Sequence, residues 1–333
     1  MTELVKNNSK SPSNKWISFR SELKVLDCTI RDGGLMNDHN FDDQVVKAVY
    51  NACVQSGIDY MELGYKADQK IFSRDQYGAW KFTTEKDMRR IVGKNETSLK
   101  LSTMADVGKT NYKTDILKKK DSVLDLIRVA TYIHQIPGAI DMINDAHDKG
   151  YETSVNMLAI STVPEHELHA ALALLMETPV ETIYLVDSFG SLYSEQIQYL
   201  MKKYMNYANP VGKTIGMHAH NNMQLAYANT VETIVQGANM VDASMAGLGR
   251  GAGNCQMELL LGFLHNPKYK LRPVLECIRD VIEPMRKNLL WGPSIPYMIT
   301  GLLNQHPRTA IRFMETGDRD DVVKFFDQIL AED

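Results

Sequence analysis

Two histidines separated by one residue, His218 and His220, are the clearest candidates for chemistry in this chain. Alternate residues of a β-strand point to the same face, with Cα atoms roughly 6.5 to 7 Å apart, so both imidazoles could bind one metal ion. A segment with amphipathic helical spacing, a second short apolar run and a glycine-rich loop ending at Asn254 follow. This order predicts a βαβ unit that carries its candidate ligands where a strand ends.

A second candidate group, Arg31-Asp32-Gly33-Gly34, follows the first apolar run of the chain. Taken alone, Asp-Gly is an ordinary turn signal. In a closed barrel, however, the eighth strand pairs with the first, so groups at the ends of strands one, seven and eight would meet at one rim. The ligands predicted to meet there are Asp32, His218, His220 and Asn254. Such nitrogen and oxygen ligands suit Mn²⁺, Co²⁺, Mg²⁺ or Zn²⁺ with open positions, whereas a structural zinc site would want thiolates.

The segments around these groups alternate between two patterns. Short apolar or β-branched runs, predicted to be strands, occupy residues 25–30, 60–63, 99–105, 124–130, 153–158, 182–186, 214–217 and 240–243. Helical spacing occurs between them at residues 42–56, 138–149, 164–176 and 194–206. Eight strands alternating with helices predict a parallel (β/α)₈ TIM barrel, an α/β fold. An open doubly wound sheet alternates in the same way and is the second choice.

The two ends of the chain depart from this alternation. Residues 1–20 are polar, lack the apolar segment of a signal peptide, and are predicted to be a poorly ordered arm. Residues 21–266 would form the catalytic barrel. In residues 267–333 helical segments are interrupted at Trp291-Gly292-Pro293, which predicts a helical C-terminal extension. This extension would pack on the barrel rim or form the interface of a homodimer.

The composition and the cysteine spacing favour a cytoplasmic protein without a nucleic-acid or membrane partner. With 44% hydrophobic residues and a net charge of −4, the chain shows no sign of a nucleic-acid or membrane partner. No uncharged apolar run approaches the roughly 18 residues of a membrane span. The four cysteines lie far apart without a CxxC pair, which is typical of reduced thiols.

Four sequence motifs indicate a family resemblance when they are considered together. They are Asp27-Cys28-Thr29-Ile30-Arg31-Asp32-Gly33-Gly34, Glu62, His218-Ala219-His220-Asn221-Asn222 and Gly247-Leu248-Gly249-Arg250-Gly251-Ala252-Gly253-Asn254. In combination they resemble the DRE-TIM metallolyase superfamily, which includes hydroxymethylglutaryl-CoA lyase, 4-hydroxy-2-oxovalerate aldolase, and isopropylmalate and homocitrate synthases. The resemblance covers roughly residues 25–264. It implies a TIM barrel and a divalent metal, with Mn²⁺ favoured, bound by Asp32, His218 and His220, with Asn254 where some members supply another ligand.

The resemblance also implies roles for residues around the metal. Arg31 matches the arginine that binds the substrate and steadies an enolate, and Glu62, placed at the end of the second strand, matches the acidic group that orients this arginine. Ser188 lies where the aldolases have a serine near the carboxylate of the 2-oxo acid. In the oxovalerate aldolases a histidine three residues after the metal-binding aspartate is the acid/base. That position is Leu35 here, so the general base is unassigned.

Several further residues are candidates on position alone. Candidates for the missing base are His39, four residues after Leu35, and Tyr65, Tyr132 and His134, which lie at or just beyond predicted strand ends. Tyr297, which follows the Trp291-Gly292-Pro293 break, is a candidate substrate contact if this segment forms a lid over the barrel mouth. A purely structural turn is the preferred interpretation of this segment.

The predicted activity is that of a divalent-metal-dependent aldolase that cleaves or forms a 4-hydroxy-2-oxo acid through a pyruvate-type enolate. Its partners would be a 2-oxo acid and an aldehyde. Residues 246–254 resemble the aldolase branch, since the acyl-CoA condensing branch typically carries Gly-Glu-Arg in this loop. The alternatives are a Claisen-type acyltransferase joining an acyl-CoA to a 2-oxo acid, a non-haem iron oxygenase with the same ligand types, and a non-catalytic barrel, suggested by Leu35.

Overall fold

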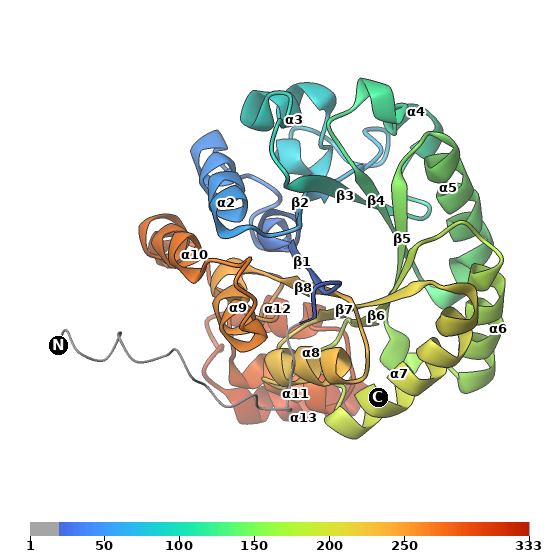
Figure 1. The fold of residues 1–333 in the computed structure, drawn as a ribbon. Helices are drawn as coiled ribbons and strands as arrows, with labels where there is room; N and C mark the ends of the chain where they lie inside the picture. Colours follow the sequence, from blue (N-terminus) through green and yellow to red (C-terminus); the bar gives the residue numbers. More distant parts are fainter. Residues whose placement is uncertain (1–19, 333) are drawn as a thin grey trace, which may run out of the picture.

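Eight parallel strands close into a barrel in the computed structural model of the chain, which describes residues 20–332 (Figure 1). The strands, in their order around the barrel, are β1 (Lys24–Asp27), β2 (Tyr60–Tyr65), β3 (Lys100–Asp106), β4 (Leu126–Thr131), β5 (Glu152–Met157), β6 (Thr182–Asp187), β7 (Thr214–Ala219) and β8 (Met240–Ala243). Strand β8 pairs with β1 from Lys24↔Met240 to Asp27↔Ala243, which closes the ring. The predicted TIM barrel is confirmed, and the open sheet is excluded. The arm predicted for residues 1–20 lies, apart from its last residue, outside the described residues.

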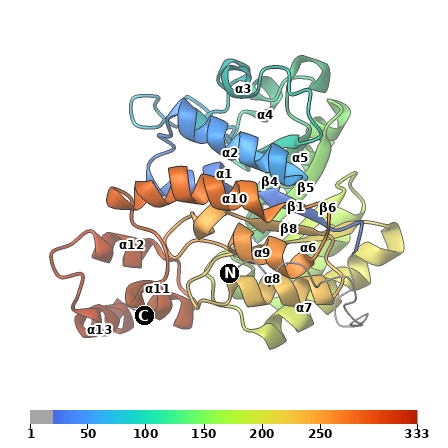
Figure 2. The ribbon, with the colours of Figure 1, turned by 60° about the vertical axis from the view of Figure 1, so that its left-hand side comes forward.

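Helices surround the barrel as an outer layer (Figure 1). They are α2 (Asp43–Ser56), α3 (Glu85–Val92), α4 (Tyr112–Asp115), α5 (Ile136–Asp148), α6 (Glu165–Met176), α7 (Ser194–Ala208), α8 (Ala226–Val235), α9 (Met257–Leu264) and α10 (Leu271–Cys277). Helix α10 lies beside α2, as Figures 1 and 2 both show. Within residues 20–332, no helix combines the length and the apolar character needed to cross a membrane.

The core has two layers because strand side chains alternate between two faces. Val25, for example, belongs to the large apolar cluster formed between strands and helices. Its neighbour Leu26 belongs to a smaller buried cluster that includes Tyr184 of β6 and Met240 of β8, and fills the inside of the barrel. The strands that lead to the predicted ligands are thus buried on both faces.

The first predicted strand is shorter than expected. Residues 25–30 were predicted to be extended, but β1 ends at Asp27 and residues Thr29–Gly33 form a single helical turn, α1. The Asp27 carboxylate accepts hydrogen bonds from the Thr29 backbone N–H at 3.1 Å and from the Thr29 hydroxyl at 2.7 Å. Such a bond from a side chain to the backbone two residues ahead turns the chain out of the sheet. Arg31 and Asp32 therefore project from a buried turn of helix.

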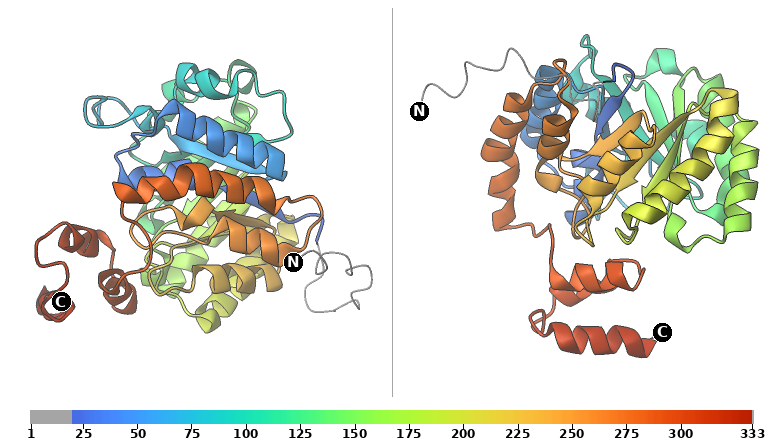
Figure 3. Two further views of the ribbon diagram at one scale, coloured as in Figure 1. Left: turned by 90° about the vertical axis from the view of Figure 1, so that its left-hand side faces the viewer. Right: turned by 60° about the horizontal axis from the view of Figure 1, so that its bottom comes forward.

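The C-terminal part of the chain is helical, as predicted, but it is interrupted more often than expected. The segment before the predicted break begins as α10, which ends at Cys277. It continues as a π-helical turn (Ile278–Ile282) and a 3₁₀ turn (Glu283–Lys287) that contains Pro284, which lacks a backbone donor. After the predicted break come α11 (Ile295–Leu302), α12 (Arg308–Met314) and α13 (Val322–Glu332). These three helices stand beyond one end of the barrel (Figures 2 and 3). The homodimer stays a prediction.

Candidate active site

A cavity of about 320 Å³ lies at the carboxyl ends of the strands, the end at which TIM barrels carry their active sites. Its wall contains groups from α1, from several strands, from the glycine loop after β8 and from the C-terminal extension. The polar lining residues that bear on the chemistry are Arg31, Asp32, Asn156, His218, His220 and Arg250. The extension contributes His306 and Arg308, so this part of the chain completes the cavity.

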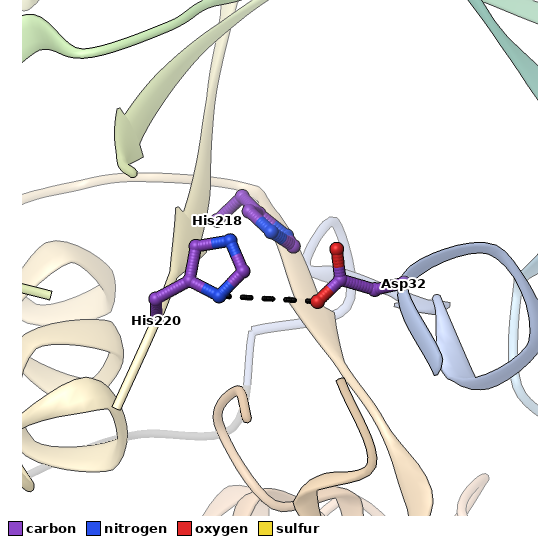
Figure 4. A group of neighbouring side chains, drawn as sticks. All are labelled: Asp32, His218 and His220. Carbon is purple, nitrogen blue, oxygen red and sulfur yellow. Dashed lines mark ion pairs between the residues drawn. The ribbon is translucent and has the colours of Figure 1, made fainter. Parts of the chain in front are cut away.

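Asp32, His218 and His220 converge at the floor of this cavity (Figure 4). Each offers a ligand atom, and these three atoms all lie within 4.8 Å of one another. His218 lies in β7 and His220 directly follows that strand, while Asp32 comes from α1 on the neighbouring side of the barrel. His220 Nδ1 is 3.8 Å from Asp32 Oδ2, and all three side chains are buried. The structure therefore brings these three predicted ligands together.

The His218 ring is oriented by Asp242 of β8. His218 Nδ1 is 3.0 Å from Asp242 Oδ2, a contact in which the ring N–H donates to the carboxylate. The proton is then on Nδ1, which leaves Nε2 as the free lone pair. Nε2 is buried and has no hydrogen-bond partner among the residues that the structure describes. A carboxylate behind a histidine in this manner is the usual support of a metal-ligating imidazole.

The charge state of the cluster also fits a divalent cation. Burial by itself would raise the pKa of Asp32, but the adjacent Arg31 guanidinium lowers it well below its usual range. Burial, reinforced by Arg250, lowers the pKa of His220 well below its usual value, so this imidazole is neutral at pH 7. An ionised carboxylate and neutral imidazole lone pairs are the forms that bind metal. The donors present thus suit Mn²⁺, Co²⁺, Mg²⁺ or Zn²⁺.

Asn254 reaches the same cluster through its side-chain amide. Its side-chain Nδ2 donates to Asp32 Oδ2 at 2.7 Å, so in this structure it holds the carboxylate, and its Oδ1 is left without a partner among residues 20–332. The loop approaches closely here because position 249 is glycine. A Cβ at Gly249 would lie 2.2 Å from Asn254 Nδ2 and 2.5 Å from Asp32 Oδ2. The glycine therefore allows the loop to pack against the cluster.

Arg31 forms two charged hydrogen bonds, as its predicted role requires. Its Nε donates to Glu62 Oε2 at 2.7 Å, and its Nη1 donates to Asp32 Oδ1 at 2.6 Å. Glu62 lies in the middle of β2, and the prediction that it ends this strand is wrong, because β2 continues to Tyr65. Burial lowers the pKa of Arg31, but the two carboxylates more than offset this and raise it. Arg31 Nη2 has no partner within the described part of the chain, so it is a free donor.

Two charged residues in this network were not predicted. Arg128 of β4 donates from Nη1 to Glu62 Oε2 at 2.8 Å and from Nη2 to Asp242 Oδ2 at 2.5 Å. A continuous chain of buried ion pairs thus joins Asp32 to His218 through Arg31, Glu62, Arg128 and Asp242. The signal in the sequence was a charged residue inside each of two apolar runs, since such residues are seldom fully buried without a partner.

Asn156 of β5 was also missed. It is 1% exposed and lines the cavity, and neither of its amide atoms has a hydrogen-bond partner among the residues described. A buried amide with both ends unpaired is costly, so this side chain is suited to contact a ligand in the cavity.

Of the two remaining predicted substrate contacts, one lines the cavity and the other does not. Ser188 lines the cavity, and its Oγ accepts the Ala159 backbone N–H at 2.9 Å. Tyr297 is not part of this wall: its side chain is buried in the apolar cluster of the C-terminal helices, with Phe313 and Phe325. The expected lid contact is therefore not found, because the apolar ring of Tyr297 joins the packing of α11 to α13.

The candidates for a general base separate into two groups. Tyr65 and Tyr132 line the cavity, as does Leu35 at the position of the missing histidine. His39 is 1% exposed and lies behind Tyr65, with the two ring centroids 5.3 Å apart in an edge-to-face contact. His134 stacks on Tyr132, with ring centroids 5.9 Å apart. Among these candidates, the groups that face the cavity and can exchange a proton are thus the two tyrosine hydroxyls.

Comparison with known proteins identifies relatives of this chain in both sequence and fold. The sequence profile of the HMGL-like family matches residues 22–282. A 4-hydroxy-2-oxovalerate aldolase of Pelotomaculum thermopropionicum is 30% identical over 80% of this chain and 78% of its own length, and one of Bacillus thuringiensis is 27% identical over 82% and 78%. The solved N-terminal domain of a provisionally named aldolase from Bacteroides vulgatus superimposes with a TM-score of 0.76, at 26% identity, over 90% of this chain and 99% of that one.

Proposed function

The chain belongs to the HMGL-like family and is an enzyme, a lyase, and from this premise we propose that it is a divalent-metal-dependent aldolase acting on 4-hydroxy-2-oxo acids. The observation that carries the proposal is the convergence of Asp32, His218 and His220 at the floor of the cavity, with the lone pair of His218 Nε2 unpaired among the described residues. The substrates would be a 2-oxo acid such as pyruvate and an aldehyde. Mn²⁺ is the favoured ion.

The three ligands have a defined task in this proposal. A divalent cation held by Asp32, His218 and His220 would polarise the carbonyl of a 2-oxo acid and stabilise the negative charge that develops when the carbon–carbon bond breaks or forms. Asp242 holds the His218 ring in the required tautomer, and Asn254 holds the Asp32 carboxylate. The protein therefore fixes the ligands before the substrate arrives, which removes the cost of reorganisation during the reaction.

Arg31 supplies a fixed positive charge next to the metal ligands. Its Nε and Nη1 are held by Glu62 and Asp32, and Nη2 remains free to donate to the oxygen of an enolate. Because Glu62 is itself held by Arg128, the guanidinium plane cannot turn freely. Asn156 offers an amide to the same cavity and would orient the 2-oxo acid.

Tyr65 is the group we assign to proton donation. Burial raises the pKa of its hydroxyl, so the hydroxyl is protonated at neutral pH although Arg31 opposes this shift. A protonated phenol that faces the cavity can donate a proton to the aldehyde oxygen in the direction of condensation. Leu35, at the position of the aldolase histidine, lines the cavity, but its apolar side chain cannot exchange a proton.

To test the proposal, the protein is incubated with pyruvate and Mn²⁺ in D₂O, and NMR follows the signal of the pyruvate methyl group. We expect metal-dependent exchange of methyl hydrogen for deuterium, and a new 4-hydroxy-2-oxo acid when a short aldehyde is added. Release of thiol from acetyl-CoA in the presence of a 2-oxo acid would instead indicate the acyltransferase. A protein that binds no metal and exchanges no hydrogen would refute the aldolase.

A further inference from the structure

The cavity carries more positive charge than the metal cluster requires. Its cationic lining residues are Arg31, Lys81, Lys109, Arg250 and Arg308, and its acidic ones are Asp32 and Asp106. Two of these cations are neutralised within the protein, because Arg31 pairs with Asp32 and Glu62, and Lys109 lies 3.4 Å from Asp106. The surplus belongs to the other three. An excess of positive charge in a recessed site attracts and holds anions.

Arg250 is the most unusual of these cations. Its guanidinium donates from Nη2 to the Ser188 carbonyl at 2.5 Å, and its backbone N–H donates to Asp32 Oδ2 at 3.2 Å. Within residues 20–332 its guanidinium has no carboxylate partner, and its Nε is buried without a hydrogen bond. A guanidinium that is partly withdrawn from water and forms no ion pair is stabilised by a ligand that supplies negative charge.

His306, from the segment between α11 and α12, faces the same guanidinium. Its Nδ1 accepts the Arg308 backbone N–H at 3.1 Å, so the neutral ring carries its proton on Nε2. Nε2 lies 3.3 Å from Arg250 Nη1, which is also a donor. Two N–H donors facing each other repel unless an acceptor oxygen takes both. Burial, with a smaller effect of the positive charges of Arg250 and Arg308, lowers the pKa of His306 to about 3.

Arg308 completes the group. It lies at the first residue of α12, its side chain is exposed, and it lines the cavity while forming no ion pair among the residues that the structure describes. Arg250 and the His306–Arg308 segment come from the loop after β8 and from the C-terminal extension, so the three groups meet only in the folded chain. Ile311 of α12, one turn further on, also lines the cavity.

We infer that Arg250, His306 and Arg308 form an anion-binding wall that takes an acidic group on the aldehyde half of the substrate. The inference rests on the proposed function for the statement that the anion belongs to an aldehyde. The chemistry recognised is that of a carboxylate or a phosphate, for which a guanidinium fork and an imidazole N–H are matching donors. The enzyme would thus join a 2-oxo acid to an anionic aldehyde, or split a product that carries negative charge at both ends.

The binding arm of the test does not depend on the aldolase reaction. Inorganic phosphate and succinate are titrated into the full chain, without added metal, by calorimetry at low ionic strength. We expect saturable binding that weakens at least tenfold in Arg250→Gln and Arg308→Gln. Arg312→Gln is the matched control, because Arg312 is an exposed arginine on the same helix that does not line the cavity. Arg308→Gln alters an exposed side chain, so its result stands even if Arg250→Gln fails to fold.

The kinetic arm compares aldehydes of similar size with and without charge. Succinic semialdehyde is compared with butanal, and glyceraldehyde 3-phosphate with glyceraldehyde, each with pyruvate and Mn²⁺. In one of the two pairs, the charged aldehyde should have a kcat/KM at least tenfold higher than its neutral partner. The pair that shows this difference identifies the preferred anion as a carboxylate or a phosphate. Arg308→Gln should abolish this preference. Equal use of charged and neutral aldehydes, or absent anion binding in the wild type, would overturn the anion wall. Loss of pyruvate exchange with intact anion binding would instead refute the aldolase alone.

Discussion

Substitution of Asp242 by asparagine is a sharp test of how the metal ligands are held. Asp242 Oδ2 accepts from His218 Nδ1 at 3.0 Å and from Arg128 Nη2 at 2.5 Å, at the centre of the barrel. Asparagine has nearly the same shape, but its amide can donate to Nδ1 and so place the imidazole proton on Nε2, the atom that should bind metal. Loss of such a supporting carboxylate typically weakens metal binding about 10- to 100-fold, or about 1.4 to 2.7 kcal/mol.

The same substitution has a separate cost in stability. Arg128 is fully buried and would keep only Glu62 as a charged partner, at 2.8 Å. Removal of one member of a buried ion pair costs about 3 to 5 kcal/mol, and the lower end applies here because the asparagine oxygen can still accept a hydrogen bond. Urea unfolding of the metal-free protein measures this term by itself, and titration with Mn²⁺ followed by electron paramagnetic resonance of the free ion measures affinity.

Asp187→Asn is the matched control for Asp242→Asn. Asp187 is a buried aspartate at the end of β6 whose carboxylate accepts the backbone N–H groups of Ser191 and Leu192, and within residues 20–332 it forms no hydrogen bond with either histidine ring. We expect its Mn²⁺ affinity to stay within about twofold of the wild type, because the ligand shell is unaltered. A folded Asp242→Asn protein with wild-type Mn²⁺ affinity would refute the idea that this carboxylate sets the tautomer of His218.

Three further predictions address the site and its surroundings. Arg31→Lys should retain metal but lose kcat on the order of 100-fold, since a point charge cannot replace the planar fork; unchanged kcat in steady-state assays would exclude this role. Gly249→Ala should weaken Mn²⁺ binding, because its Cβ would lie 2.5 Å from Asp32 Oδ2, whereas Gly262→Ala, with open space around its Cβ, should not; equal titrations would contradict the packing. Burial, with a smaller effect of Lys81, lowers the pKa of His39 to about 3. As the pH falls from 7 to 5, His39 therefore takes up a proton in the unfolded chain but not in the folded one, and the free energy of unfolding falls by about 2 kcal/mol. His39→Asn, which tolerates the backbone φ of 62°, should flatten that part of the pH profile in urea titrations, and an unchanged slope would argue against it.

The barrel could be predicted from the sequence because its signals are local. Apolar runs and helical spacing alternate along the chain, and barrel closure then brings the ends of β1, β7 and β8 to one rim. His218 and His220 were predictable as a pair for the same reason, since residues two apart on a strand share a face. The convergence of Asp32 with them followed from topology alone.

The features that were not predicted depend on contacts that residue spacing does not show, and all but the first of them join residues far apart in the chain. The turn after β1 is set by the hydrogen bonds of Asp27 to Thr29, which compete with a run of β-forming residues. The pairing of Arg128 with Asp242 spans 114 residues, and it depends on which strand faces which across the barrel. Tyr297 could be placed only after the apolar partners on α12 and α13 were known. Such contacts require three-dimensional packing, which local spacing does not encode.

The most direct test of the account is a joint measurement of Mn²⁺ content and pyruvate methyl exchange in the wild type, Asp32→Asn and His218→Ala. Residues at this rim of a TIM barrel serve function more than stability, so both variants should fold, as circular dichroism would show. We predict a single bound ion and rapid exchange in the wild type, with both lost in either variant. Wild-type metal content and exchange in a folded variant would contradict the shared metal site and the chemistry built on it.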